Sequence, residues 1–124
     1  MNEEKIEERM DLRKRCFKFS LEIIKITDHL PQKRSAWVIT DQLIRSACSI
    51  GANLVEAKGS SSRKEFKKFF EISLKSANET TYWLCLLRDS GLSKKEEINS
   101  LLREVDEITK MIGSAVIKLK GPRI

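Results

Sequence analysis

Apolar residues recur along this chain at alternating intervals of four and three, the spacing of helices that pack around a shared core. The first series is Leu12, Cys16, Phe19, Ile23, Ile26 and Leu30, and the last is Ile98, Leu101, Val105, Ile108, Ile112, Ala115 and Leu119. The series are separated by Pro31, by Gly59 with three serines, and by Gly91, all typical of helix ends. The pattern predicts helices at about residues 2–29, 33–58, 63–89 and 93–119.

Signals at the helix ends support this division. Residues 62–65 and 93–96 each match the S-x-x-E capping box that opens a helix. The start of the first helix stays open between Asn2 and Asp11. Long helices joined by short turns predict an all-α, antiparallel up-down-up-down four-helix bundle, formed by residues 1–124 as a single domain.

The second predicted helix contains a segment of low charge. Residues 36–57 hold only three charged residues, whereas 34% of the whole chain is charged. The apolar and small residues of this helix are spread over all of its sides, which is typical of a helix covered on all sides. Its polar residues are too frequent for a membrane span. Because one bundle of 124 residues cannot cover such a helix alone, we expect a homo-oligomer. The candidate interface residues are Trp37, Ile72, Glu79, Trp83 and Leu86.

Polar residues within the same segment form a stripe. Arg45, Ser49, Asn53 and Glu56 recur at spacings that place them along one side of a helix. Since buried polar groups need partners, we expect a polar network in which they meet one another, Glu79 or a neighbouring subunit. A ligand site at the same stripe is the alternative.

The inventory of reactive residues argues against catalysis. Cys16, Cys48 and Cys85 lie far apart and lack any spacing typical of metal ligands. Reduced thiols, with no apolar signal segment at the N-terminus, predict a cytoplasmic protein. The single histidine, His29, falls at the end of the first helix, where a cation complements the helix dipole. Without it no catalytic triad can be assembled, and no Gly-rich phosphate loop or Glu-x-x-His pair occurs, so we expect no enzyme, no metal and no cofactor.

Positive charge is concentrated in two short segments. The chain has a net charge of +6, and residues 58–68 hold five Lys or Arg against one Glu. A second basic run lies in the first helix, and in an antiparallel bundle the starts of the first and third helices share an end. We therefore expect both runs on one basic rim. The candidate nucleic-acid-binding residues are Arg13, Lys14, Arg15, Lys18, Lys58, Arg63, Lys64, Lys67 and Lys68.

Two interpretations of this rim stay open. Cations beside the free backbone N–H groups of a helix start suit phosphate, so the rim could bind nucleic acid without reading its sequence. A solvated charged surface is the alternative. Aromatic residues that could stack on bases are missing from the two runs apart from Phe17 and Phe66, which we assign to packing.

Two stretches of the chain resemble signatures of a known family. QLIRSACSIGANLVEAKGSSSRKEF (residues 42–66) is close to S-I-x-x-N-x-x-E-x-x-G followed by a basic segment and Phe. SLKSANETTYWLCLLRDSGL (residues 73–92) matches a second signature, with Glu79, Tyr82, Trp83 and Leu84 in place. Residues 19–120 thus resemble the bacterial four-helix bundle proteins of the 23S rRNA intervening-sequence family.

This resemblance implies an antiparallel bundle that assembles as a homopentamer, with helices lining a central channel. It also implies kinship with accessory proteins of diversity-generating retroelements, which are basic pentamers that bind nucleic acid and a reverse transcriptase. No catalytic residues come with the family. We therefore predict a non-enzymatic, pentameric bundle that binds RNA or DNA through its basic rim. The rival hypothesis is a scaffold that binds a reverse transcriptase or another protein, without nucleic-acid contact.

Overall fold

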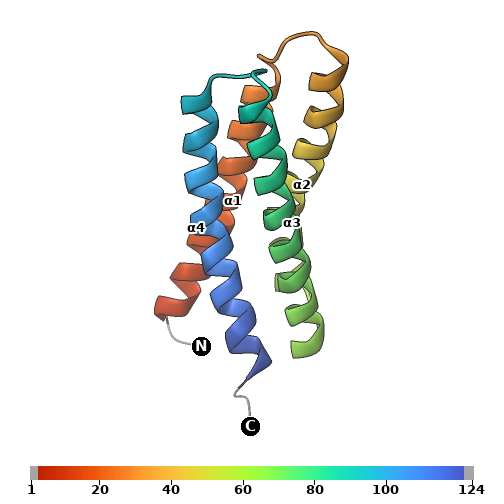
Figure 1. Ribbon diagram of the computed structural model, residues 1–124. Helices are drawn as coiled ribbons and strands as arrows, with labels where there is room; N and C mark the ends of the chain where they lie inside the picture. Colours follow the sequence, from red (N-terminus) through yellow and green to blue (C-terminus); the bar gives the residue numbers. More distant parts are fainter. Residues whose placement is uncertain (1–2, 122–124) are drawn as a thin grey trace.

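The protein is all-α over the part of the chain that the computed structural model describes, residues 3–121, with side chains from Leu12 onward. Its helices are α1 (Glu3–Thr27), α2 (Arg34–Lys58), α3 (Arg63–Asp89) and α4 (Lys95–Lys120). They lie side by side, and the chain reverses direction at each turn (Figure 1). The all-α class and the four predicted helices are confirmed.

Each helix packs against two others. α2 and α3 form the most extensive contact and α1 and α4 the least extensive, and α1 and α3 are diagonal to each other. The α1–α2 and α3–α4 turns lie at one end of the molecule (Figure 1). At the other end lie the α2–α3 turn, the first turn of α1 and the last turn of α4.

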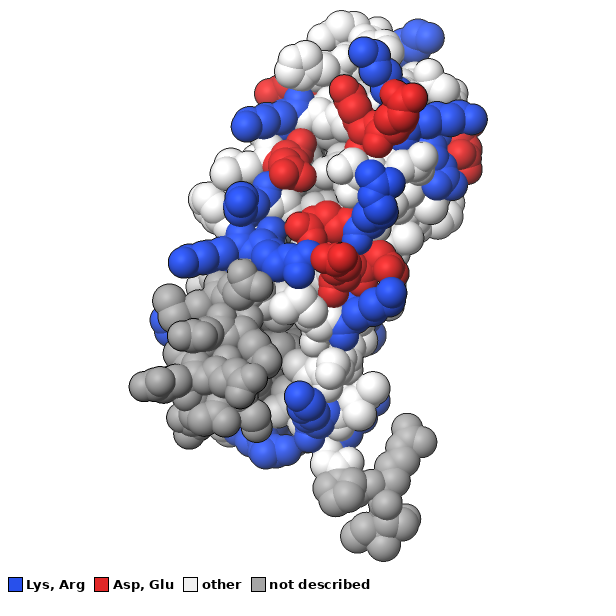
Figure 2. Space-filling view, turned by 90° about the vertical axis from the view of Figure 1, so that its left-hand side faces the viewer, with Lys and Arg blue, Asp and Glu red and all other residues white. Residues whose placement is uncertain are grey.

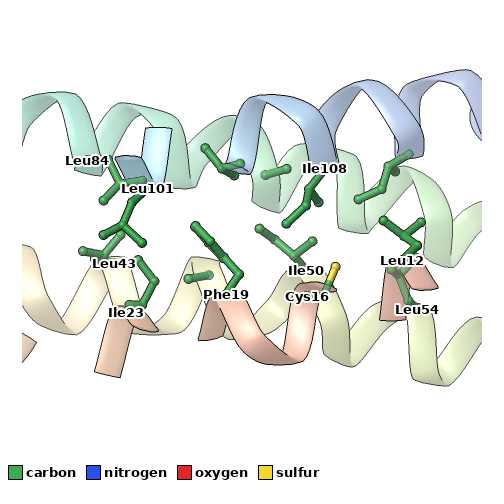
Figure 3. Packing of buried hydrophobic residues seen from close by; sticks show 14 of the residues in the cluster. Leu12, Cys16, Phe19, Ile23, Leu43, Ile50, Leu54, Leu84, Leu101 and Ile108 are labelled. Atoms are coloured by element: carbon green, nitrogen blue, oxygen red, sulfur yellow. The ribbon is translucent and has the colours of Figure 1, made fainter. Parts of the chain in front are cut away.

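The core contains the apolar series that the periodicity predicts. Phe19 and Ile23 of α1 point toward Leu43 and Ile50 of α2 and toward Ile108 of α4 (Figure 3), and all five are fully buried. Burying a side chain of this size contributes about 1.5–3 kcal/mol to stability. The packing is tight enough that a Cβ atom added at Gly51 would lie 3.1 Å from the Cβ of Cys16. A glycine at this position therefore allows the close approach of α1 and α2.

One of the two predicted capping boxes is present. The Ser62 side chain accepts a hydrogen bond from the backbone N–H of Glu65, at 3.1 Å, and caps α3. The cap predicted at Ser93 is wrong, because α4 starts at Lys95 and its N-cap residue, Lys94, makes no side-chain cap bond. Gly91, with φ +78°, makes the turn that precedes it. This turn moves the helix start past Ser93.

The ends of α1 differ in part from expectation. α1 starts at Glu3, which favours the earlier of the two predicted starts, and ends at Thr27. His29 therefore lies just beyond the helix, where its Nδ1 donates a hydrogen bond to the carbonyl oxygen of Lys25 at 2.7 Å. This bond satisfies one of the last carbonyl groups of α1, which is a structural role.

Candidate functional site

Cations from three helix ends converge at one end of the bundle. Lys58 ends α2, and Arg63, Lys64, Lys67 and Lys68 occupy the first turns of α3. The Arg63 guanidinium donates a hydrogen bond to the carbonyl oxygen of Leu119 at 3.3 Å, which joins the end of α4 to the start of α3. We call the combined surface the basic end; it consists of Lys58, Arg63, Lys64, Lys67, Lys68, Lys118 and Lys120.

Lys118 and Lys120 are exposed members of the basic end that sequence reasoning missed. Basic residues in the last turn of a helix complement its dipole, so their presence there needed no ligand to explain it. Only the packing of α4 beside α3 makes them neighbours of Arg63. Within the basic end, Lys67 is the member that forms an ion pair, with Glu71 at 3.7 Å, among the residues with described side chains.

The basic run of α1 does not join the basic end. Because α1 starts at Glu3, Arg13 lies ten residues into the helix, about 15 Å along its axis. α1 is also diagonal to α3. The expectation that both basic runs share one rim is therefore wrong. The residues concerned, which lie in the middle of α1, are Arg13, Lys14, Arg15 and Lys18.

Arg15 is held in an ion-pair network with α4. Its guanidinium donates to the carboxylates of Glu104 and Glu107, and also contacts the sulfur of Met111 at 3.5 Å. Hydrogen bonding to Glu104 and Glu107 raises the pKa of Arg15, so it stays charged. On the side of the molecule seen in Figure 2, acidic and basic side chains are interspersed at mid-height. This region is thus a balanced surface that links the two least extensively packed helices.

The polar stripe of α2 is turned toward α3. Arg45 forms an ion pair with Glu79, as expected, and the indole N–H of Trp83 donates to the same carboxylate at 2.9 Å. Asn53 donates to the Ser49 hydroxyl at 2.9 Å, and so does Ser76 of α3, also at 2.9 Å. The stripe is therefore divided into two groups and does not form one network.

Glu56 takes no part in either group. Its side chain is exposed, and it makes no hydrogen bond or ion pair with any of the side chains described from Leu12 to Gly121. Within one chain Glu56 therefore lies outside the polar groups, and its contact with a neighbouring subunit stays a prediction. Glu56 lies exposed in the last turn of α2, whereas Ser49 and Asn53 are half-buried earlier in the helix.

A face of exposed apolar residues follows α1 and α2. On α1, Arg15 points to α4, and Phe17 lies about 200° further round the helix. On α2, Arg45 and Ser49 point to α3, which leaves the opposite edge beside α1. Five large apolar side chains of α1 and α2 on this side of the molecule are between 41% and 67% exposed. We call them the α1–α2 apolar face; its residues are Phe17, Leu21, Ile24, Trp37 and Val55. Phe17, assigned above to packing, is the most exposed of them.

A smaller patch lies on the α2–α3 side. Val38 is seven residues, or about two turns, before Arg45 and so faces the same side of α2. We call the group of Val38, Trp83 and Leu86 the α2–α3 apolar patch. Of the candidate interface residues, Trp37 and Leu86 are exposed, and Ile72, Glu79 and Trp83 are half-buried. Trp37 belongs to the α1–α2 face, whereas the other four lie on α3.

Three further features concern metal binding, thiol chemistry and hydropathy among the described residues. No three of their His, Cys, Asp or Glu side chains come close enough to hold a metal ion. Burial raises the pKa of the Cys16 thiol to about 12, which keeps it protonated and unreactive at neutral pH. No helix within residues 3–121 has the length and hydropathy needed to cross a membrane.

These features define an all-α bundle with a cationic end and apolar sides. Residues 8–114 match the family model of the 23S rRNA-intervening sequence protein, and the chain belongs to that family. It is also similar to a crystal structure from Bacteroides thetaiotaomicron, a protein of unknown function in the S23 ribosomal protein family. That similarity has a TM-score of 0.83 and 32% identity, and covers 89% of this chain and 98% of the other. No curated protein matches this chain. Neither description names an enzymatic activity.

Proposed function

We propose that copies of this chain assemble into a homo-oligomer, a pentamer, that binds RNA or DNA through the basic end without reading its sequence. The observation that carries the proposal is the convergence of cations from the ends of α2, α3 and α4. Lys and Arg side chains that contact phosphates release condensed counterions, and this release supplies most of the affinity of sequence-independent binding. The proposal assigns the protein no catalytic step.

The backbone at this end supports the same conclusion. The first N–H groups of α3 have no partner within the helix, and Ser62 satisfies the N–H of Glu65. The remaining N–H groups favour an anion, and the surrounding cations add to that preference. α1 starts at the same end, and residues 1–10 hold four Glu against one Lys and one Arg, which reduces the positive charge without cancelling it.

Assembly is the second part of the proposal. The α1–α2 apolar face and the α2–α3 apolar patch expose several large apolar side chains, as interaction sites do, and a contact between copies would cover them. We place the assembly in the cytoplasm, where cysteines such as Cys48 and Cys85 stay reduced and nucleic acid is available.

A second candidate function is a scaffold for another protein, such as a reverse transcriptase. The exposed α1–α2 apolar face favours it, because faces of this kind are typical of protein–protein contacts. The two functions differ in their dependence on salt. Phosphate binding weakens steeply as salt rises, whereas an apolar contact does not.

A binding assay with matched charge variants tests nucleic-acid binding. Fluorescence anisotropy would measure the affinity for a labelled RNA hairpin and a DNA duplex from 50 to 300 mM salt. The double variant Lys64→Glu/Lys68→Glu removes two exposed cations of the basic end. We expect it to weaken binding at least about tenfold and to lower the salt slope by roughly two. The Glu at position 64 lies in the first turn of α3, where it complements the helix dipole, and position 68 is exposed, so the fold should persist.

The control variant is Lys14→Glu/Lys18→Glu. It changes the net charge by the same amount, but at exposed positions in the middle of α1. We expect this control to lose less than about threefold in affinity, because it changes only the long-range electrostatic field at the basic end. Equal losses in the two variants would assign binding to net charge and not to the basic end. Absence of binding by the wild-type protein at low salt would refute the proposal and favour the scaffold.

A further inference from the structure

The outer side of α3 carries a stripe of polar residues, and α3 itself runs from the basic end to the opposite end of the bundle (Figure 1). Ser73 and Ala77 are buried against the other helices, and Lys75 lies about 160–200° round α3 from both. Residues spaced from Lys75 by alternating steps of three and four share its side. We call this set the α3 outer stripe; it consists of Lys64, Lys68, Glu71, Lys75, Asn78 and Tyr82. The stripe is about 27 Å long, and all of its members are exposed except the half-buried Glu71.

Positive charge dominates the α3 outer stripe. Lys64, Lys68 and Lys75 form no ion pair or hydrogen bond within the part of the chain whose side chains are described. The acidic member, Glu71, lies 3.7 Å from the Nζ of Lys67, so its charge is balanced locally. Successive cations of the stripe are about 6 Å and 10 Å apart along the helix axis. Such a line of cations complements the phosphates of a nucleic-acid strand, whose charges also repeat along a line.

Tyr82, at the far end of the stripe, provides an exposed aromatic ring. It is 61% exposed, and its ring makes a T-shaped contact with Trp83, with the centroids 5.1 Å apart and the ring planes at 78°. A T-shaped contact covers at most one face of a ring, so a face of Tyr82 remains for another partner. Asn78 is exposed one turn earlier, and its amide has both donors and an acceptor. An unpaired base can stack on such a ring and form hydrogen bonds with such an amide.

We propose that a single strand of RNA or DNA bound at the basic end continues along the α3 outer stripe. Its phosphates lie on Lys64, Lys68 and Lys75. One of its bases stacks on Tyr82 beside Asn78. This inference rests on the proposed function, which it deepens by naming single-stranded nucleic acid as the class of ligand. The bases of a duplex are already paired and stacked, so a duplex can bind the basic end but offers no base to Tyr82. Stacking suits every base, so the contact does not depend on sequence.

Two labelled RNA probes test the contact with Tyr82. One is an unstructured oligouridylate of about 12 nucleotides, and the other is an RNA duplex of the same length. Tyr82→Leu should weaken binding of the single strand at least about fivefold, because one stacked base is lost, and should leave the affinity for the duplex unchanged. Tyr82→Phe keeps the ring and should bind both probes as the wild-type protein does. In addition, a single strand that contains 4-thiouridine should cross-link on irradiation to the peptide that contains Tyr82.

A pair of lysine variants tests the phosphate contacts. Lys75→Gln removes the cation of the stripe that lies furthest from the basic end. It should lower the salt slope for the single strand by about 0.7 and leave the slope for the duplex unchanged. Lys25→Gln, at an exposed position of α1, is the matched control and should change neither slope. An unchanged single-strand slope in Lys75→Gln would overturn the inference.

The results also separate this inference from the proposed function. If Tyr82→Leu weakens neither probe, or weakens both equally, the inference is overturned. The proposed function still stands in that case, provided that the wild-type protein binds the duplex and Lys64→Glu/Lys68→Glu weakens that binding. Absence of wild-type binding to either probe at low salt would overturn both.

Discussion

Ser73 and Thr80 show how polar side chains can be buried between α2 and α3 with their hydrogen bonds satisfied. Ser73 donates to the carbonyl oxygen of Ile50 at 2.8 Å, and Thr80 lies 3.0 Å from the hydroxyl of Ser46. All three side chains that carry these hydroxyls are fully buried, and every buried side-chain nitrogen or oxygen of the described residues has a partner. Small hydroxyl residues thus let α2 and α3 approach closely while their polar groups stay satisfied.

Cys16 gives a prediction about stability and pH. Burial raises the pKa of its thiol from the ordinary value of 9.0 to about 12, against a smaller opposite effect of Arg15. Below pH 9 the thiol is protonated in the folded and unfolded states alike. Above pH 9 the unfolded chain ionises first, so the stability that the buried thiol contributes is lost as the pH rises toward 12, by up to about 1.4 kcal/mol per pH unit.

Urea denaturation of the wild-type protein and of Cys16→Ala, under reducing conditions, measures this effect. We expect the difference between their free energies of unfolding to narrow by about 1.4 kcal/mol between pH 8 and pH 10. Other groups titrate in the same range, but they are common to both proteins and cancel in the difference. A difference that stays constant with pH would show that the Cys16 thiol is not desolvated in the folded state.

The starts of α3 and α4 give a prediction at the scale of the helix. Ser62 caps α3, whereas Ser93 makes no hydrogen bond within the described part of the chain and precedes the N-cap of α4. Ser62→Ala should therefore lower the free energy of unfolding by about 1 kcal/mol. Ser93→Ala should change it by less than about 0.5 kcal/mol. Denaturant midpoints of the two variants check this, and equal costs would mean that the S-x-x-E pattern caps both helices.

Periodicity predicted the helices and most of the core because it depends only on the geometry of one helix. Leu12, Phe19 and Ile108 are buried in the structure, as their spacing requires. The helix ends were less predictable, since Ser62 and Ser93 have the same sequence pattern. Which of the two becomes an N-cap depends on the turn before it, and the turn at Gly91 has its own backbone requirement.

The candidate site was harder to predict because it depends on how the helices are aligned. Arg13 and Lys14 would lie in the first turn of a helix that started at Asp11, but α1 starts at Glu3 and extends past them by more than two turns. A helical wheel likewise shows that Arg45 and Ser49 share a side but not which neighbour that side meets. Only the packing of α4 beside α3 brings Lys118 near Arg63, so no local pattern could reveal their proximity.

At the scale of the whole molecule, the charged and apolar surfaces occupy different places. The cations of the basic end lie at one end of the bundle, whereas the α1–α2 face and the α2–α3 patch lie along its sides. Cyclic assembly through the sides would direct all the basic ends to one side of the ring. Several basic ends acting on one strand raise the effective concentration of binding sites, so weak phosphate contacts would add to a useful affinity.

This arrangement predicts a contact between unlike surfaces, in which the α1–α2 face of one copy meets the α2–α3 patch of the next. Phe17→Glu and Leu86→Glu each place a charge in one of the two surfaces, where it would be buried without a partner. We expect each variant alone to run as a monomer in light scattering, with its helicity retained, and the wild-type protein to run as an oligomer. Ile117→Glu is the control, because Ile117 is 71% exposed and is the single exposed large apolar residue within the described part of α4.

Mixing the two variants separates this geometry from a symmetric one. The Phe17→Glu chain keeps an intact α2–α3 patch, and the Leu86→Glu chain keeps an intact α1–α2 face. If the contact joins unlike surfaces, the two intact surfaces can pair in the mixture. A third chain cannot add to this pair, because each of its two remaining surfaces carries an introduced charge. The mixture should contain dimers with one chain of each kind. If the α1–α2 faces paired with each other instead, the Leu86→Glu chain would assemble by itself. The Phe17→Glu chain would then stay monomeric both alone and in the mixture. A wild-type protein that runs as a monomer would contradict both arrangements.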